Sequence, residues 1–120
     1  MSGPLIFDVR ESKDLVFAKL CGRMTLGPHL RAFSDRLEPL IASRAGLALL
    51  LDVHEVSELD SAGLGELVIL LTASDERHWR MCLIGPSERL LGILDSTRLL
   101  DLFPHFPDRQ TAEEWLLGQS

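Results

Sequence analysis

The sequence predicts an α/β domain in which a mixed β-sheet is flanked by about four α-helices, in the order β-β-α-β-α-β-α-(β)-α. The first observation behind this class is that short apolar runs alternate with amphipathic stretches, as strands and helices do in layered folds. The second is size, because 120 residues with 46% apolar side chains suffice for one core. No linker or internal repeat interrupts the pattern, so residues 1–120 are assigned to one domain.

The first third of the chain predicts a hairpin followed by a helix. Residues 5–10 and 15–21 are rich in strand formers, and a short polar turn separates them. Thr25 is the expected N-cap of the helix, and Pro28 suits its first turn. Apolar residues then recur at three- and four-residue spacing to a helix end near Arg44.

The middle of the chain predicts a buried strand and a second helix. Residues 47–53 are a continuous apolar run, typical of a strand covered on both faces, and residues 54–60 read as an acidic loop. Residues 61–78 predict a helix with a core-facing stripe of Leu64, Leu67, Val68 and Leu71. Three more apolar residues lie outside that stripe: Ile69, Leu70 and Ala73. They indicate either deep burial or a partner-binding face, and the sequence leaves both open.

The last third predicts one more strand, two helices and a short extended piece. Residues 81–84 form the strand, and Ser87 is the expected cap of the third helix. Residues 103–107 are proline-flanked and extended. The last helix is expected to start at Asp108 or Thr111.

Composition narrows the function. The net charge of −6 argues against nucleic acid and against anionic membrane surfaces, because both bind basic faces. No run of roughly 20 apolar residues and no secretory signal is present, so we expect a cytoplasmic protein without membrane insertion. Cys21 and Cys82 stand far apart among apolar neighbours, which is typical of buried thiols in a reducing compartment.

The segment from Asp60 to Gly65 is the candidate site, because it follows a buried strand and opens a helix. A helix N-terminus favours a phosphate, and Ser61 would present its hydroxyl there. Gly63 and Gly65 remove side chains beside it, so that another protein can approach closely. Phosphorylation would add about −1.5 to −2 charges to an already acidic patch and so act as a switch. The plainer alternative is that Ser61 only caps the helix.

This segment, in its context, resembles STAS domains, and especially the bacterial anti-sigma factor antagonists. The resemblance rests on Asp60-Ser61-x-Gly63-Leu64-Gly65 after a buried strand. It extends over nearly the whole chain, through Gly22, Leu51-Asp52, Val56, Leu83-Ile84-Gly85-Pro86-Ser87, Leu90, Leu94 and Leu99-Leu100. Three positions depart from the usual pattern: Ala62 replaces a second hydroxyl residue, Glu58 an apolar one, and Arg23-Met24-Thr25 an acidic stretch.

The resemblance implies partner switching. The unphosphorylated protein would bind an anti-sigma factor that is also a serine kinase of the GHKL type, and so release a sigma factor. The kinase would phosphorylate Ser61, and a phosphatase would reset it. ATP and magnesium would belong to the kinase, so this chain needs no cofactor of its own.

The residues of the expected site follow from the resemblance and from proximity. Asp60, Gly63, Leu64 and Gly65 would shape the surroundings of Ser61. Partner recognition is expected from residues near them in sequence: Asp52, His54, Glu58, Ala62 and Glu66. The rim of the second helix could equally support a homodimer.

The sequence raises three alternatives to the switch. A constitutive STAS scaffold, or an accessory subunit of a signalling assembly or membrane transporter, would need no phosphorylation cycle. A hydrolase would need G-x-S-x-G, but Leu59 stands where its first glycine should be, so we expect no enzyme. Carboxylate and imidazole groups that could bind a metal are present at Asp52, His54, Glu55 and Asp60. We interpret this segment as a solvated acidic loop.

Overall fold

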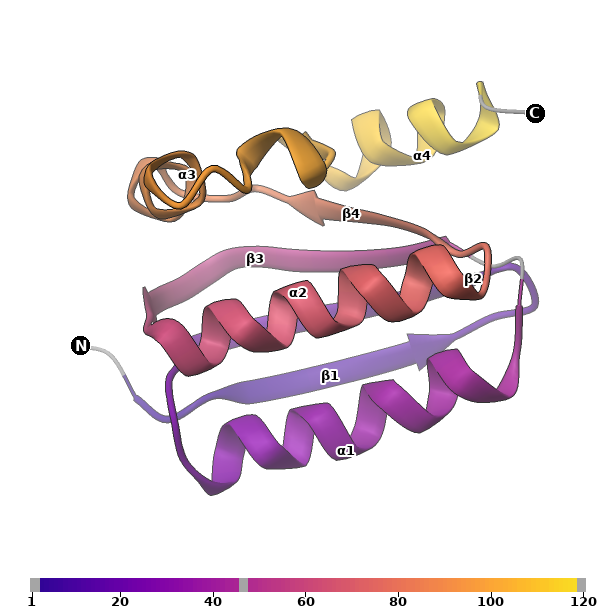
Figure 1. The fold of residues 1–120 in the computed structure, drawn as a ribbon. Helices are drawn as coiled ribbons and strands as arrows, with labels where there is room; N and C mark the ends of the chain where they lie inside the picture. Colours follow the sequence, from indigo (N-terminus) through magenta and orange to yellow (C-terminus); the bar gives the residue numbers. More distant parts are fainter. Residues whose placement is uncertain (1–2, 46–47, 119–120) are drawn as a thin grey trace.

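The computed structural model describes residues 3–45 and 48–118, which form a five-stranded mixed sheet with helices on both faces (Figure 1). The strands are β1 (Ile6–Glu11), β2 (Leu15–Met24), β3 (Ala48–Leu59), β4 (Arg80–Ile84) and β5 (His105–Phe106). The helices are α1 (Pro28–Ser43), α2 (Ser61–Glu76), α3 (Glu88–Ser96), α4 (Arg109–Leu117) and a 3₁₀ turn at Leu100–Leu102. None of these helices is both long and apolar enough to cross a bilayer.

The strands lie side by side in chain order, and only the first pair is antiparallel. β1 and β2 form the predicted hairpin, and β2, β3, β4 and β5 then run parallel to one another. Each parallel connection passes through a helix, as a crossover requires. This arrangement confirms the predicted fold class and the predicted order of elements.

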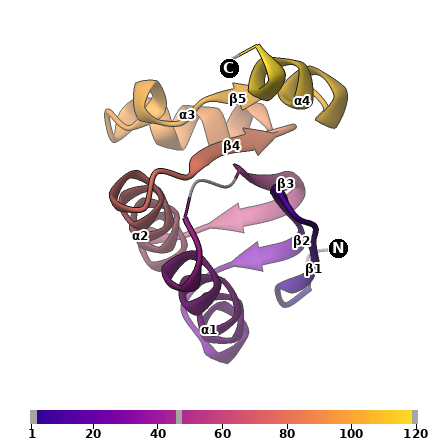
Figure 2. The same cartoon turned by 90° about the vertical axis from the view of Figure 1, so that its right-hand side faces the viewer.

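The helices divide the core into two layers. α1 and α2 lie side by side on one face of the sheet, and α4 lies on the other (Figure 2). On β2, Val16, Ala18 and Leu20 are buried towards the α1–α2 side, as the period of a strand demands. On the opposite face, Ala112 of α4 is buried against β3 and β4.

Three of the four α-helices have a side-chain N-cap, and that of α2 is Asp60. Ser87 and Asp108 cap α3 and α4 as predicted, each accepting a hydrogen bond from the backbone N–H three residues on. At α1 the prediction is wrong: the N-cap is Gly27, without a side-chain bond, and Thr25 plays no part. Pro28 does occupy the first turn of α1, where its missing N–H costs nothing.

Two further predictions need correction. β3 does not end at Val53 but continues through the segment expected as an acidic loop, because residues up to Leu59 keep pairing with β2. (Leu47, expected in the same strand, lies outside the described residues.) α2 ends at Glu76, and its most buried apolar residues are Leu67 and Leu70, although Leu70 was placed outside the core stripe.

The cysteines are both free thiols. Cys82 is buried in the sheet, and this burial raises the pKa of its thiol to about 12. Cys21 is only half-buried.

Candidate functional site

The candidate site lies where β2 and β3 end together. These strands run parallel and stay paired to their last residues, Met24 opposite Leu59. The turn that leads into α1 and the start of α2 are therefore neighbours at one edge of the sheet. Carboxyl-terminal edges of parallel strands are the usual place for sites in α/β folds.

Asp60 joins these two segments through its carboxylate. One oxygen, Oδ1, accepts a hydrogen bond from the Gly63 N–H at 2.9 Å and caps α2. The other, Oδ2, accepts one from the Leu26 N–H at 2.9 Å, across the gap to the turn before α1. The Leu26 bond, then the Gly63 bond, lowers the pKa of Asp60 below its ordinary value. Asp60 is thus an ionised clamp between the two helix starts.

Ser61 is left free by this arrangement. It is the first residue of α2 and is exposed, while the N-cap role belongs to Asp60. Its hydroxyl makes no hydrogen bond to any described residue. The alternative that Ser61 serves only as the helix cap is therefore wrong.

The two glycines of the segment have different reasons to be glycine. A Cβ on Gly63 would stand 2.1 Å from the backbone oxygen of Met24 and 2.8 Å from Leu59 Cδ1, so Gly63 is required by packing inside the domain. A Cβ on Gly65 would meet nothing within 4 Å. Only Gly65 matches the expectation of an open approach for another molecule.

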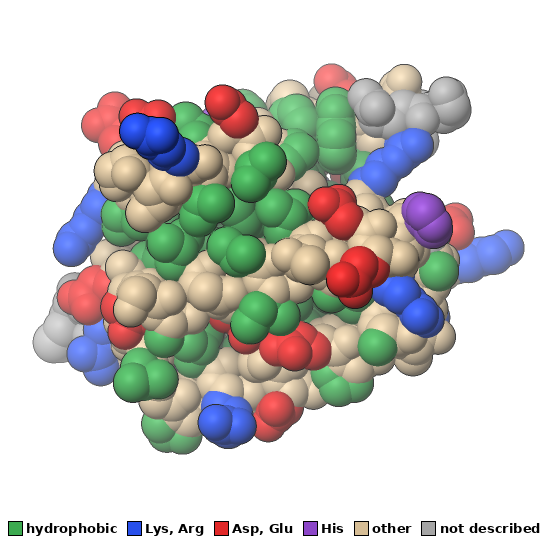
Figure 3. All heavy atoms as spheres, viewed as in Figure 1, with side chains coloured by type: hydrophobic (Ala, Val, Ile, Leu, Met, Phe, Trp, Pro, Cys, Tyr) green, Lys and Arg blue, Asp and Glu red, His purple; other side chains and the backbone are tan. Residues whose placement is uncertain are grey.

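The outward face of α2 carries no exposed charge over most of its length. From Ser61 to Ser74, all of them described, the only ionisable side chain is that of Glu66, which is buried. Ile69 is 49% exposed on this face. Figure 3 shows hydrophobic side chains gathered along α2 and in the strip between α2 and α3. Burial accounts for Leu70, which is fully buried, but not for Ile69, which faces solvent. A partner-binding role for Ile69 stays a prediction.

The expected recognition residues do not all lie near Ser61. Ala62 and Leu64 sit beside Ser61 and are half-buried against the core, and Glu58 lies at the end of β3 opposite Arg23. Asp52 lies seven residues before the end of β3, roughly 20 Å away at the ordinary strand rise.

Two of these residues have local roles that the sequence did not indicate. The Asp52 carboxylate accepts a hydrogen bond from the His54 N–H at 3.0 Å. Glu66 faces α1 instead of Ser61. No part of the chain that the structure describes groups three or more His, Cys, Asp or Glu side chains as a metal site would.

Leu26 was missed by sequence reasoning. It is 83% exposed in the turn before α1, and its N–H is held by Asp60. The sequence held a signal, since a leucine between Thr25 and Gly27 continues no apolar periodicity. An exposed leucine on a clamped turn next to Ser61 extends the uncharged surface of the site.

Comparison with known proteins identifies the family. The family model described as "STAS domain" matches residues 28–112, so the chain belongs to the STAS domain family. No curated protein matches the chain by sequence.

Solved structures with the same fold include regulators and a transporter domain. The anti-sigma factor antagonist SpoIIAA in its unphosphorylated form superposes with a TM-score of 0.79 at 16% identity, covering 94% of this chain and 97% of that one. An anti-sigma factor antagonist from Mycobacterium paratuberculosis gives 0.75 at 20% identity, covering 95% and 97%. The murine anion transporter Slc26a9 gives 0.69 at 17% identity, where 91% of this chain matches 18% of that one.

Proposed function

We propose that this protein is an anti-sigma factor antagonist controlled by phosphorylation at Ser61. In its unmodified form it binds an anti-sigma factor that is also a GHKL-type serine kinase, and a sigma factor is released. Phosphorylation ends the complex, and a phosphatase restores it. The protein is itself no enzyme and works in the cytoplasm, while ATP and magnesium are held by the kinase.

One observation carries the proposal: an exposed and unbonded Ser61 hydroxyl stands at the start of a helix with an uncharged outer face. A kinase can reach such a hydroxyl without unfolding anything. The positive end of the α2 dipole tolerates the added phosphoryl group, so the fold persists. A partner docked over Ser61, Gly65 and Ile69 would instead meet up to two new negative charges in an apolar contact.

The proposal is tested by measuring the affinity of the purified protein for GHKL-type anti-sigma kinases from its own organism. Ser61→Ala should bind as the unmodified protein does. Ser61→Asp should bind at least ~10-fold more weakly, which corresponds to ~1.4 kcal/mol. Ser96→Asp, at an exposed serine at the end of α3, is the matched control and should bind normally.

The docking face has its own test. Ile69→Glu places a charge on the outer face of α2 and should weaken the complex by about tenfold or more. Ile6→Glu is the control, because Ile6 is 66% exposed on β1, away from α2. Equal affinity of both variants for the partner would show that the outer face of α2 is not part of the interface.

A second candidate function is a constitutive STAS module within a signalling assembly or a transporter. The fold likeness to part of Slc26a9 favours it. Equal affinity of Ser61→Ala and Ser61→Asp for the partner, with no phosphoryl group gained from kinase and ATP, would establish this candidate over the switch.

A further inference from the structure

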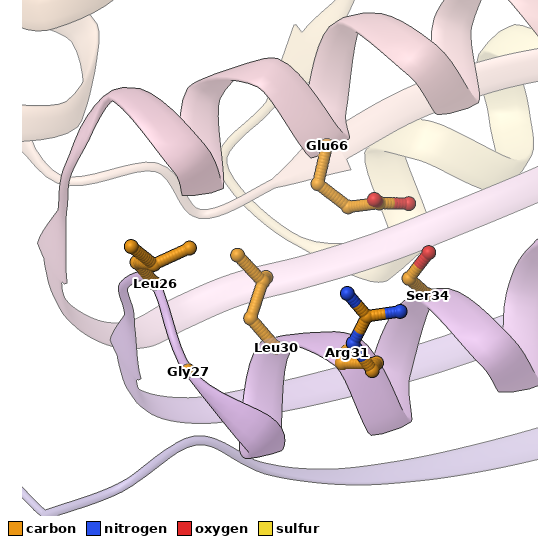
Figure 4. Close-up of a pocket in the computed structure, with 6 residues that line it drawn as sticks. All are labelled: Leu26, Gly27, Leu30, Arg31, Ser34 and Glu66. Carbon is orange, nitrogen blue, oxygen red and sulfur yellow. The ribbon is translucent and has the colours of Figure 1, made fainter.

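A groove between α1 and α2 contains a pair of carboxyl groups that the site at Ser61 does not use. Acidic side chains are visible between the two helices in Figure 3, and Figure 4 shows Glu66 extending from α2 towards Ser34 on α1. The groove holds a pocket of about 180 Å³ lined by Leu26, Gly27, Leu30, Arg31, Ser34 and Glu66. A second hollow continues along the same helices past Ser34, Asp35 and Glu38.

Glu66 is unusual among the charged residues because it is only 6% exposed. Its Oε2 atom is buried and has no hydrogen-bond partner among the described residues. Across the groove the Ser34 hydroxyl donates to Oε2 of Glu38, and both of these side chains also interact with the Glu66 carboxyl. Two carboxyl groups from different helices therefore meet around one hydroxyl.

The surrounding charges do not neutralise this pair. On α1 the groups that face Glu66 are Glu38, Asp35 and Arg31, and α2 contributes no other ionisable side chain between Ser61 and Ser74. The Leu26–Gly27 turn contributes none. The Arg31 guanidinium lines the pocket but forms no ion pair within 4.0 Å with a described carboxylate.

Glu66 is buried and Glu38 is half-buried, and two neighbouring carboxylates repel each other unless one holds a proton. Burial, reinforced by Glu38, raises the pKa of Glu66 from 4.5 to about 7. A protonated Glu66 has a donor for Glu38, which turns a repulsive contact into a hydrogen bond.

We infer that Glu66 and Glu38 share one proton across the contact between α1 and α2, and that losing this proton weakens the contact. The pH-sensitive device is separate from the Ser61 switch and stands whether or not Ser61 is modified. It adjoins that site, because the groove ends at Leu26, whose N–H is bound by Asp60.

The sign of the effect follows from linkage. The folded state holds the Glu66 proton more tightly than the unfolded chain, so the folded state is favoured at low pH. Stability then falls as the pH rises from about 4.5 towards the folded pKa of about 7, and the loss is complete above it.

The experiment is urea unfolding of the full chain between about pH 5 and about pH 8.5 for four proteins. The wild type should lose stability across this range. Glu66→Gln, a neutral isostere, should remove this loss and lower the unfolding equilibrium constant at the highest pH by about tenfold or more. Glu76→Gln is the matched control, since Glu76 is exposed in the last turn of the same helix, and it should follow the wild type.

Carboxyl ¹³C NMR titration of the wild type reads the same proton directly and does not depend on any variant folding. Glu66 should titrate near neutrality in the wild type, and nearer its ordinary value in Glu38→Gln. A Glu66 midpoint near 4.5 in the wild type, or parallel stability profiles for the wild type and Glu66→Gln, would overturn the inference.

Discussion

The two ends of α2 are attached to the domain in opposite ways. At the C-terminal end the Trp79 indole N–H donates to the carbonyl oxygens of Ile41 and Arg44, at 3.2 and 2.8 Å, and Arg77 donates to the carbonyl of Ala42. Ser74 is buried and bonds back to the Leu70 carbonyl. The bonds from Trp79 and Arg77 fix the end of α2 to the end of α1.

At the N-terminal end the Asp60 carboxylate holds the turn before α1, and the Asp60 N–H donates to the Met24 carbonyl at 3.3 Å. Beside them lie an exposed serine and an uncovered glycine. The difference separates a tightly packed end of the helix from an open end, and the proposed function places recognition at the open end. Changes at the buried end should alter unfolding, and changes at the open end should alter binding.

The largest effect is expected where this division fails, at Gly63, which lies at the open end but is packed against β2. Gly63→Ala should destabilise the domain by about 3 kcal/mol, because its Cβ would collide with a backbone oxygen that cannot move cheaply. Gly65→Ala is the control one half-turn on and should stabilise by up to about 1 kcal/mol through helix propensity. Urea unfolding measures both, and equal effects would remove the distinction between the two glycines.

The next effect sharpens the role of the buried end. Trp79→Phe keeps an aromatic ring but removes the N–H that two carbonyl oxygens share, so we expect a loss of about 2 kcal/mol. Trp79 is 4% exposed and lies away from Ser61, so affinity for the partner should stay unchanged in the folded protein. Weaker binding by the folded variant would contradict the division between the two ends.

A smaller effect is expected at the open end from Asp60→Ala, which removes the cap of α2 and the bond to Leu26. The cost should be about 1 kcal/mol. Because the folded pKa of Asp60 lies below the unfolded one, the contribution is present above about pH 4 and is lost as the pH falls through the folded pKa. Asp108→Ala is the matched control, since it removes the cap of α4 without releasing a second segment. The pKa of Asp108 is also lowered, by its bonds to Thr111, so both cap contributions are lost in acid. Thermal unfolding across this range should show the larger loss for Asp60→Ala, because that variant also loses the bond to Leu26.

The sequence predicted the elements better than it predicted their contacts. Strand and helix periodicity was sufficient for the hairpin, the crossovers and the caps at Ser87 and Asp108, because these are local. The acidic end of β3 looks like a loop in sequence, since polar residues on an open sheet face alternate with few apolar ones. The sequence does not predict the burial of Glu66, because that burial depends on α1 lying against α2.

The candidate site shows the same limit. The motif indicated both Ser61 and Asp60, but it did not predict what the Asp60 carboxylate binds. Its second hydrogen bond joins residues 34 positions apart, and only the parallel pairing of β2 and β3 brings them together.

The most direct test of the central claim is a phosphate-affinity gel of the native protein from growing and stressed cells, beside a Ser61→Ala strain. The account predicts a shifted band that changes with conditions and is absent from the mutant strain. A single unshifted band under every condition, in cells where the partner kinase is present and active, would contradict the switch and favour a constitutive binding domain.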